Sequence, residues 1–303
     1  MGARIDQLYA SSPGSLFVPL TFRLALHLEQ LTWREFLADP NLASFALRSA
    51  SGLFQTKVFI NWFDDWMEAE SADIEVSRDD LGQAQRVPGS YLKSIAVADV
   101  LKNDPCKTVL DVTKRLCAEV GDNTAVLGYV TGGATLLARL YGDEDAGAIV
   151  KAITAGKLSA AQKKKLDSVV QLSSALINEY CERGIGGIVL VEHDPVSSFG
   201  YLKAFDSVFN LAQYFGVPVL ILVRSPLTAG MIAAAQALGA AWAIGTGAAQ
   251  PGASVITQLA VGAGPEALGA EFGEKGLYIT EWDLAADTDP AMVSAFSDHF
   301  MKH

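Results

Sequence analysis

The sequence predicts an α/β protein whose single domain, residues 1–303, folds as a (β/α)8 barrel of the TIM type. Eight short apolar runs recur along the chain, helix-length segments separate most of them, and several runs are apolar at almost every position. A parallel strand that is covered on both faces requires such a continuous apolar pattern. Eight strand and helix units in alternation then predict the barrel, with an open doubly wound sheet as the alternative.

The predicted strands are rich in β-branched and aromatic residues. In chain order they span 15–21, 57–63, 125–131, 187–192, 217–223, 241–246, 254–261 and 276–280. Apolar residues at three- and four-residue steps predict helices over 109–120, 169–180 and 208–215. An aspartate followed by proline, at 39–40 and again at 289–290, predicts a capped helix start.

Two stretches depart from this pattern. Residues 73–107 form a long irregular connection after the second predicted strand, which indicates a functional loop or a local excursion. Residues 142–167 are polar and contain three consecutive lysines at 163–165, which is typical of a solvated helix face.

Composition and charge exclude several classes of protein. The 23 basic and 34 acidic residues give a net charge of −11, which argues against a polybasic nucleic-acid binder, and 50% hydrophobic residues argue against disorder. Without an apolar run of about 18 residues or a readable secretory signal, we expect no membrane association and a cytoplasmic location. The three cysteines lack metal-ligand or redox spacing, and the glycine-rich stretch 262–269 does not match a nucleotide-binding pattern, so no cofactor is predicted.

Active sites of barrel enzymes lie at the carboxyl ends of the strands, so the polar and aromatic residues that follow each strand are the candidates. They are Arg23, Asp65, Trp66, Arg139, Glu192, His193, Arg224, Glu281 and Trp282. Guanidinium groups match carboxylate geometry, so the arginines predict a small anionic substrate, and the tryptophans could stack on a planar one. The alternative is that each arginine, Arg139 above all, neutralises a neighbouring acid in a structural ion pair.

Asp65 and His193 are the predicted catalytic residues. The acids beside His193 in the sequence would favour its charged form and suit a proton shuttle. For Asp65 the structural alternative is a helix cap or a pair with an arginine.

Six segments in this order resemble the uroporphyrinogen decarboxylase family, which also contains corrinoid-linked methyltransferases, and the resemblance covers nearly the whole chain. These segments span 36–40, 63–70, 127–136, 187–195, 214–222 and 288–290. The resemblance implies a barrel whose catalytic aspartate matches Asp65. The tyrosine expected after the third strand falls at Arg139, the histidine expected after the eighth falls near Trp282, and the family's arginine-rich N-terminal segment has no counterpart beyond Arg23.

The zinc site of the methyltransferase branch has no match in this chain. Its His-x-Cys at the end of the fifth strand reads Leu222-Val-Arg224 here, and the last third of the sequence contains no cysteine. Thiolate and imidazole are the ligands that zinc requires in such sites, so no metal is predicted.

These observations predict a metal-independent, decarboxylase-like lyase that acts on a small carboxylated cyclic or aromatic substrate. In this hypothesis Arg23 and Arg224 hold the substrate carboxylate, Asp65 stabilises developing positive charge and His193 moves the proton. One alternative is a methyltransferase that works with a corrinoid or folate-type carrier. Another is a non-catalytic ligand-binding barrel, and the sequence also allows a homodimer.

Overall fold

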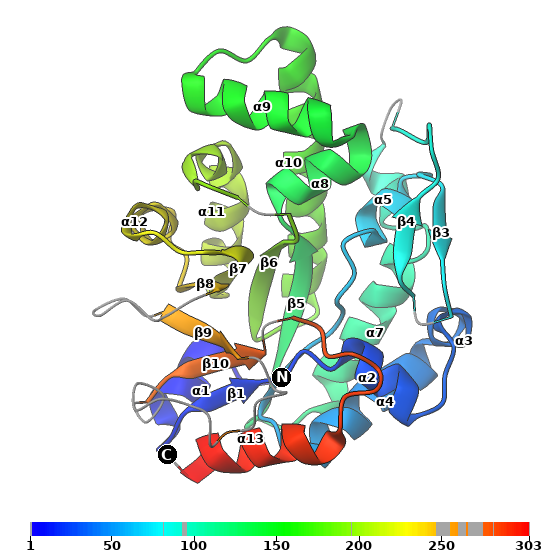
Figure 1. The fold of residues 1–303 in the computed structure, drawn as a ribbon, viewed down its shortest axis with the longest axis vertical. Helices are drawn as coiled ribbons and strands as arrows, with labels where there is room; N and C mark the ends of the chain where they lie inside the picture. Colours follow the sequence, from blue (N-terminus) through cyan, green and yellow to red (C-terminus); the bar gives the residue numbers. More distant parts are fainter. Residues whose placement is uncertain are drawn as a thin grey trace.

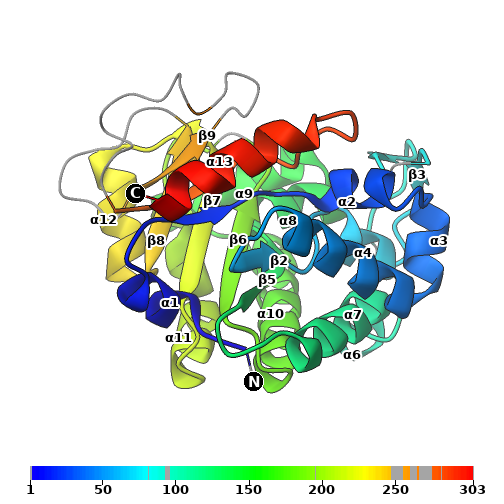
Figure 2. The same cartoon turned by 90° about the horizontal axis from the view of Figure 1, so that it is seen from below.

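The computed structural model describes residues 2–80, 82–92, 96–194, 196–246, 255–259, 265, 275–280 and 282–302. All eight predicted strands are present in this part of the chain and form one parallel sheet (Figures 1 and 2). They are β1 (Leu16–Val18), β2 (Val58–Ile60), β5 (Ala125–Thr131), β6 (Gly187–Glu192), β7 (Val219–Pro226), β8 (Trp242–Thr246), β9 (Val255–Leu259) and β10 (Leu277–Thr280).

The sheet is curled and runs in the order β1-β10-β9-β8-β7-β6-β5-β2. Each strand pairs in parallel with its neighbour, as in the register of Val58 with Ala125 and of Ile188 with Val219. Strands β1 and β2 stand at the two ends of this order, and no backbone ladder joins them within the described residues. The structure therefore shows an α/β fold around a curled parallel sheet, while closure into a complete (β/α)8 barrel is not shown.

Helices connect the strands and cover the outer face of the sheet (Figure 2). Those described are α1 (Ile5–Ser11), α2 (Phe22–Leu28), α3 (Trp33–Ala38), α4 (Pro40–Leu53), α5 (Met67–Ser71), α6 (Val97–Val100), α7 (Cys106–Glu119), α8 (Gly133–Tyr141), α9 (Asp143–Ala155), α10 (Ala160–Glu182), the 3-10 helix η1 (Gly200–Phe205), α11 (Asp206–Tyr214), α12 (Ala229–Ala237) and α13 (Pro290–Lys302).

The helical patterns in the sequence account for these positions. The apolar stripes predicted at 109–120 and 169–180 are the buried faces of α7 and α10. Asp39 caps α4, because its carboxylate accepts a hydrogen bond of 2.8 Å from the backbone N–H of Asn41. Asp289 binds the backbone N–H of Ala291 at the start of α13 in the same way, at 2.9 Å.

The stretch 73–107 is more regular than the sequence indicated. It contains an antiparallel hairpin, β3 (Val76–Arg78) and β4 (Ala84–Arg86), followed by α6 and the start of α7. The hairpin lies beside α5 in Figure 1. The polar stretch 142–167 forms α9 and the first turns of α10, and Lys163 and Lys164 are exposed, as predicted for a solvated face.

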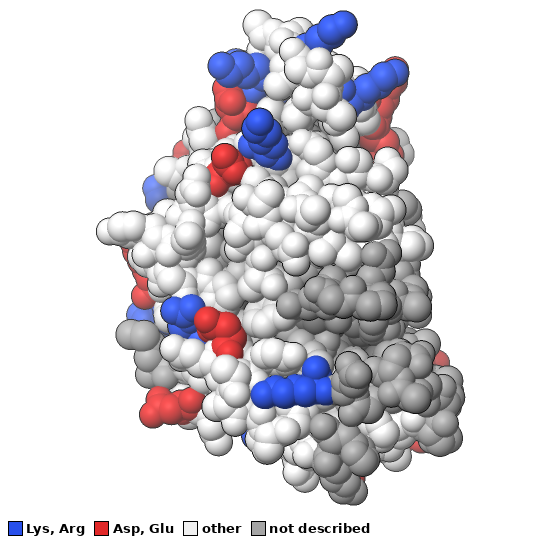
Figure 3. Space-filling model, turned by 90° about the vertical axis from the view of Figure 1, so that its left-hand side faces the viewer, with Lys and Arg blue, Asp and Glu red and all other residues white. Residues whose placement is uncertain are grey.

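Within the described residues, no helix is both long and apolar enough to cross a membrane. Figure 3 shows one face of the molecule on which basic and acidic residues are scattered in small groups, with no continuous basic area in its described part. Cys106 and Cys117 are buried and Cys181 is partly buried, and all three are free thiols, as expected of small packing residues.

Candidate active site

A cavity of about 520 Å³ brings together seven of the nine candidate site residues named from the sequence. It lies where loops follow β2, β6 and β7, and the hairpin forms one side of it. The predicted residues that line it are Arg23, Asp65, Trp66, Arg139, His193, Arg224 and Trp282, joined by Phe22, Phe63, Asp64, Asp194 and residues 82–86. Four arginines and three aspartates thus surround one cavity in a protein whose net charge is −11.

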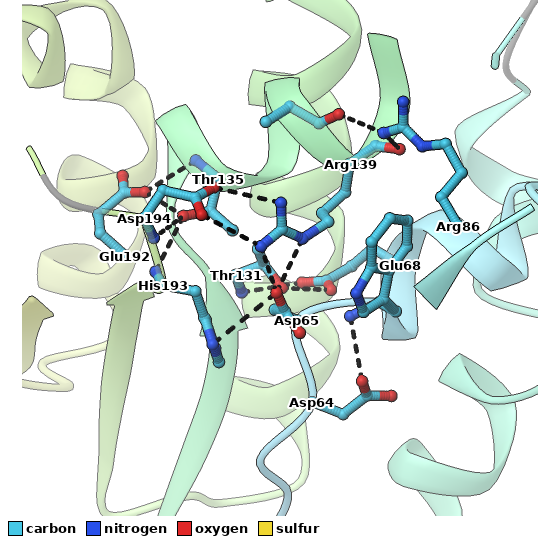
Figure 4. Close-up of polar contacts among 12 residues, drawn as sticks. Asp64, Asp65, Glu68, Arg86, Thr131, Thr135, Arg139, Glu192, His193 and Asp194 are labelled. Atoms are coloured by element: carbon cyan, nitrogen blue, oxygen red, sulfur yellow. Dashed lines mark hydrogen bonds and ion pairs between the residues drawn. The ribbon is translucent and has the colours of Figure 1, made fainter. Parts of the chain in front are cut away.

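Arg139, in the last turn of α8, is held between two carboxylates (Figure 4). Its Nε donates to Asp65 Oδ2 at 2.7 Å, and its Nη1 donates to Asp194 Oδ2 at 3.2 Å. Its guanidinium carbon also lies 5.0 Å from the ring centre of Trp66, within cation–π range. The contacts of Arg139 therefore agree with the alternative that it forms a structural ion pair, since its guanidinium N–H groups already donate to protein carboxylates.

Asp65 follows β2 and faces both Arg139 and His193. Burial alone would raise the pKa of this carboxyl, but its interactions with the His193 ring and the Arg139 guanidinium hold it below its ordinary value. Asp65 is therefore ionised at neutral pH. Its Oδ2 lies 3.8 Å from His193 Nδ1, which is too long for a hydrogen bond.

His193 is neutral at physiological pH, so the prediction that its acidic neighbours favour the charged form is wrong. Burial, together with the positive charges of Arg139, Arg224 and Arg23, lowers its pKa to about 4 against the opposing effect of Asp65. Its Nε2 lies 2.9 Å from the hydroxyl of Tyr129. Its ring stands nearly perpendicular to the ring of Trp282, in a T-shaped contact with a centroid distance of 4.7 Å.

Arg224 and Arg23 are the cavity cations with the fewest protein partners. Arg224 is exposed, its guanidinium carbon lies 4.4 Å from the ring centre of Trp282, and no described carboxylate is within ion-pair distance of it. Arg23 approaches Asp283 only at 3.6 Å. Burial raises the pKa of Asp283 to about 7, although Arg23 and the backbone N–H groups of Arg23 and Phe22 oppose that rise. The guanidinium groups of Arg224 and Arg23 can therefore still donate hydrogen bonds to an anion in the cavity.

Glu192 was predicted to bind substrate, but the structure places it behind the cavity. It is 1% exposed, and its carboxylate accepts from the backbone N–H groups of Ala134 and Thr135, from the Thr135 hydroxyl and from the Tyr201 hydroxyl. A carboxylate at this point stabilises the N-terminus of α8. Gly132 allows the approach, because a Cβ there would lie 2.3 Å from the Glu192 carboxyl carbon.

Sequence reasoning missed Glu68, which is fully buried in α5. Its Oε1 accepts from the backbone N–H of Thr131 at 2.9 Å and its Oε2 from the Thr131 hydroxyl at 2.6 Å (Figure 4). Burial raises its pKa to about 7 against these hydrogen bonds. The one signal in the sequence is that Glu68 lies between two apolar residues, Met67 and Ala69.

The hairpin is fixed to the site by two arginines that were also not predicted. Arg78 donates to Asp64 Oδ2 at 2.7 Å and to Glu70 Oε2 at 2.8 Å. Arg86 donates to the backbone carbonyls of Ala138 and Arg139 at the end of α8. These contacts hold residues 82–86 against the cavity.

Among the described residues, no group of three or more His, Cys, Asp or Glu side chains is placed to hold a metal ion. The positions of the zinc ligands in the methyltransferase branch carry Leu222 and Arg224 on β7. The donor set present does not fit zinc, which prefers thiolate and imidazole ligands. Glu281 lies outside the described residues.

Solved structures share this fold. A methyltransferase from Methanosarcina mazei superposes with a TM-score of 0.78 at 17% identity, over 97% of this chain and 96% of that one. The chain has the fold of this methyltransferase. The homocysteine methyltransferase MmuM from Escherichia coli (TM-score 0.49, 11% identity, 96% of this chain and 98% of that one) and a 2,3-dimethylmalate lyase (0.44, 12%, 97% and 91%) are too distant to support an argument.

No protein-family model and no curated protein sequence matches the chain. Membership of the uroporphyrinogen decarboxylase family therefore stays a prediction. The predicted decarboxylase or lyase function is overturned, because a structure that superposes over nearly the full length of both chains is a methyltransferase and not a lyase.

Proposed function

We propose that this chain is a methyltransferase that binds a small anionic substrate in the cavity lined by Arg224 and Trp282. The observation that carries the proposal is the superposition on the Methanosarcina mazei methyltransferase over nearly the full length of both chains. The cavity supports it, because its arginines outnumber its aspartates. Among the described residues Arg224 pairs with no carboxylate, and Arg23 approaches Asp283 only at 3.6 Å.

The cavity residues divide into two groups in this proposal. Arg224 and Arg23 bind the substrate anion, and Trp282 provides an aromatic face beside it. Asp65, Arg139 and Asp194 form an ion-pair set beside His193 and do not bind the substrate directly, while the Tyr129 hydroxyl holds the His193 ring. Rigid placement of this kind contributes to rate because reacting groups are already aligned when the substrate binds.

A corrinoid or folate-type carrier would supply or accept the methyl group at the open side of the cavity. The protein's part is to bind the anion, exclude water and manage the proton. An oxygen or nitrogen that loses a methyl group must gain a proton, and His193 is the titratable side chain placed to donate it. No step is assigned to zinc, because the donor set does not fit that metal.

The test is a turnover assay with small methylated aromatic acids, with each carrier added in turn or omitted. We expect demethylated product, followed by mass spectrometry, only when a carrier is present, and about a tenfold lower kcat/KM in Arg224→Ala. Carrier-independent release of carbon dioxide, or no turnover with any methylated acid and either carrier, would contradict the proposal.

Four further features are proposed on the sequence pattern. They are closure of the sheet into a (β/α)8 barrel, a single domain over residues 1–303, distant membership of the uroporphyrinogen decarboxylase family, and a cytoplasmic homodimer. Curling of the sheet supports the first of these.

A further inference from the structure

A continuous chain of hydrogen bonds leads from the buried interior to the cavity. Glu68 Oε2 lies 2.6 Å from the Thr131 hydroxyl, which lies 3.2 Å from the Tyr129 hydroxyl. The Tyr129 hydroxyl lies 2.9 Å from His193 Nε2. Glu68, Thr131 and Tyr129 are completely buried, whereas His193 lines the cavity. Each of these side chains both donates and accepts when Glu68 is protonated.

We infer that Glu68, Thr131 and Tyr129 form a proton path that supplies His193 from inside the protein. The hydrogen-bond geometry of the path does not depend on the reaction. Its use, to restore the proton that His193 gives to the atom that loses a methyl group, rests on the proposed function.

The transfer balances without any further reactant. In the loaded state Glu68 is a neutral acid, His193 carries its proton on Nδ1, and Nε2 accepts from Tyr129. When a substrate atom takes the Nδ1 proton, Nε2 takes one from Tyr129, Tyr129 takes one from Thr131, and Thr131 takes one from Glu68. Glu68 becomes a carboxylate, and His193 ends neutral with its proton on Nε2. Uptake of a proton from water at Nδ1 reverses the shifts.

The groups around both ends of the path support this direction of transfer. Glu68 faces Asp64, the Cys106 thiol of α7 and the Tyr180 hydroxyl of α10, and no described basic side chain forms an ion pair with it. Burial raises the pKa of Glu68 to about 7, so a share of the molecules holds this proton at neutral pH. His193 faces Tyr129, Asp65 and the three arginines Arg23, Arg139 and Arg224.

The simpler interpretation is that Glu68 only ties α5 to β5 through Thr131. Replacement of Glu68 by glutamine distinguishes this structural role from the proton path. The amide oxygen can still accept from the Thr131 backbone N–H, while no ionisable proton remains. The readout is the tautomer of His193, followed by nitrogen and carbon NMR shifts of the ring without substrate. The chain has four histidines, so His193→Gln assigns the signal.

In the wild-type protein we expect the His193 proton to move from Nδ1 to Nε2 as the pH rises through about 7, the pKa of Glu68. This step should be lost in Glu68→Gln and in Tyr129→Phe, with Thr131→Val as a second interruption if Tyr129→Phe does not fold. Tyr141→Phe, which removes a partly buried hydroxyl outside both the path and the cavity lining, is the matched control and should keep the step.

A tautomer that stays the same from pH 5 to 9, or a step that survives in Glu68→Gln, would overturn the path. Because the measurement uses no substrate and no carrier, its result is independent of the turnover assay. A working methyltransferase without the step would refute only the path, and a clear step in a protein that transfers no methyl group would refute only the proposed function.

Discussion

Arg224 is a cavity cation whose described neighbour is an aromatic ring rather than a carboxylate. We expect Arg224→Ala to weaken binding of a small carboxylate by about 1.4 kcal/mol, roughly tenfold in Kd, because a charge-assisted fork is lost from a partly exposed site. Arg224→Lys should restore only part of this, since lysine lacks the bidentate geometry. Titration calorimetry with a benzoate series measures the effect.

Arg48→Ala is the matched control for this measurement, because Arg48 pairs with Glu119 on the surface, 40% exposed and outside the cavity lining. An unchanged Kd in Arg224→Ala, with the fold intact, would show that Arg224 does not bind the anion.

Glu68 gives a second prediction at the level of a single residue, this time on stability. A carboxyl whose pKa is about 7 in the folded protein and near 4.5 in the unfolded chain binds more protons when folded, so stability falls as the pH rises from 4.5 to 7. Glu68→Gln removes this dependence, which amounts to about 3 kcal/mol over that window. Urea unfolding at pH 5 and pH 8 measures it.

The surface substitution Glu182→Gln should leave the pH dependence of unfolding as in the wild-type protein. If the unfolding free energies of the wild-type protein and of Glu68→Gln change with pH in the same way, Glu68 is not the titrating group.

At the level of secondary structure, the hairpin β3–β4 depends on Arg78, which satisfies the buried carboxylate of Asp64. Arg78→Met should cost about 3 kcal/mol of unfolding free energy, because removal of one partner leaves the other charge buried and unpaired. Chemical denaturation measures the loss, and hydrogen exchange should show faster exchange in Val76–Arg78 and Ala84–Arg86. Arg34→Met, on the exposed side of α3, is the control.

Equal losses of unfolding free energy in Arg78→Met and Arg34→Met would show that Arg78 does not specifically stabilise the hairpin. An undisturbed hairpin in hydrogen exchange, despite lower global stability, would place the effect in Asp64 alone.

The sequence predicted the eight strands because a strand covered on both faces is apolar throughout, as in Val219–Val223, and that pattern is visible without a structure. It did not predict the hairpin, because β3 and β4 have three residues each and their burial is only partial. Runs so short cannot display an alternation of apolar and polar residues. The hairpin is instead held in place by Arg78 and Arg86, whose contacts cannot be read from the sequence.

For the candidate site, the sequence predicted several of the residues that lie there, but not their burial or their charge state. Residues at strand ends are recognisable from the sequence, which located Asp65, His193 and Arg224. Burial and charge state are not, because they depend on side chains from other elements. Glu192 therefore turned out to cap α8, and His193 to be surrounded by arginines and neutral.

For the molecule as a whole, the donor atoms present predict that the purified protein holds well under one zinc per chain, because hard oxygen ligands alone bind zinc poorly. Elemental analysis after dialysis against a weak chelator measures this. About one zinc retained per chain would show that His193 and carboxylates have built a replacement site.

The three arginines around His193 have a consequence for ligand binding. They lower the pKa of the imidazole through their positive charge, and a bound anion cancels part of that charge. The pKa of His193 must then rise when the anion binds, so binding and protonation are thermodynamically linked. Calorimetry in two buffers of different ionisation enthalpy should detect proton uptake on binding, with none in His193→Gln. Binding of the anion would thus make the His193 ring more basic than it is in the empty cavity.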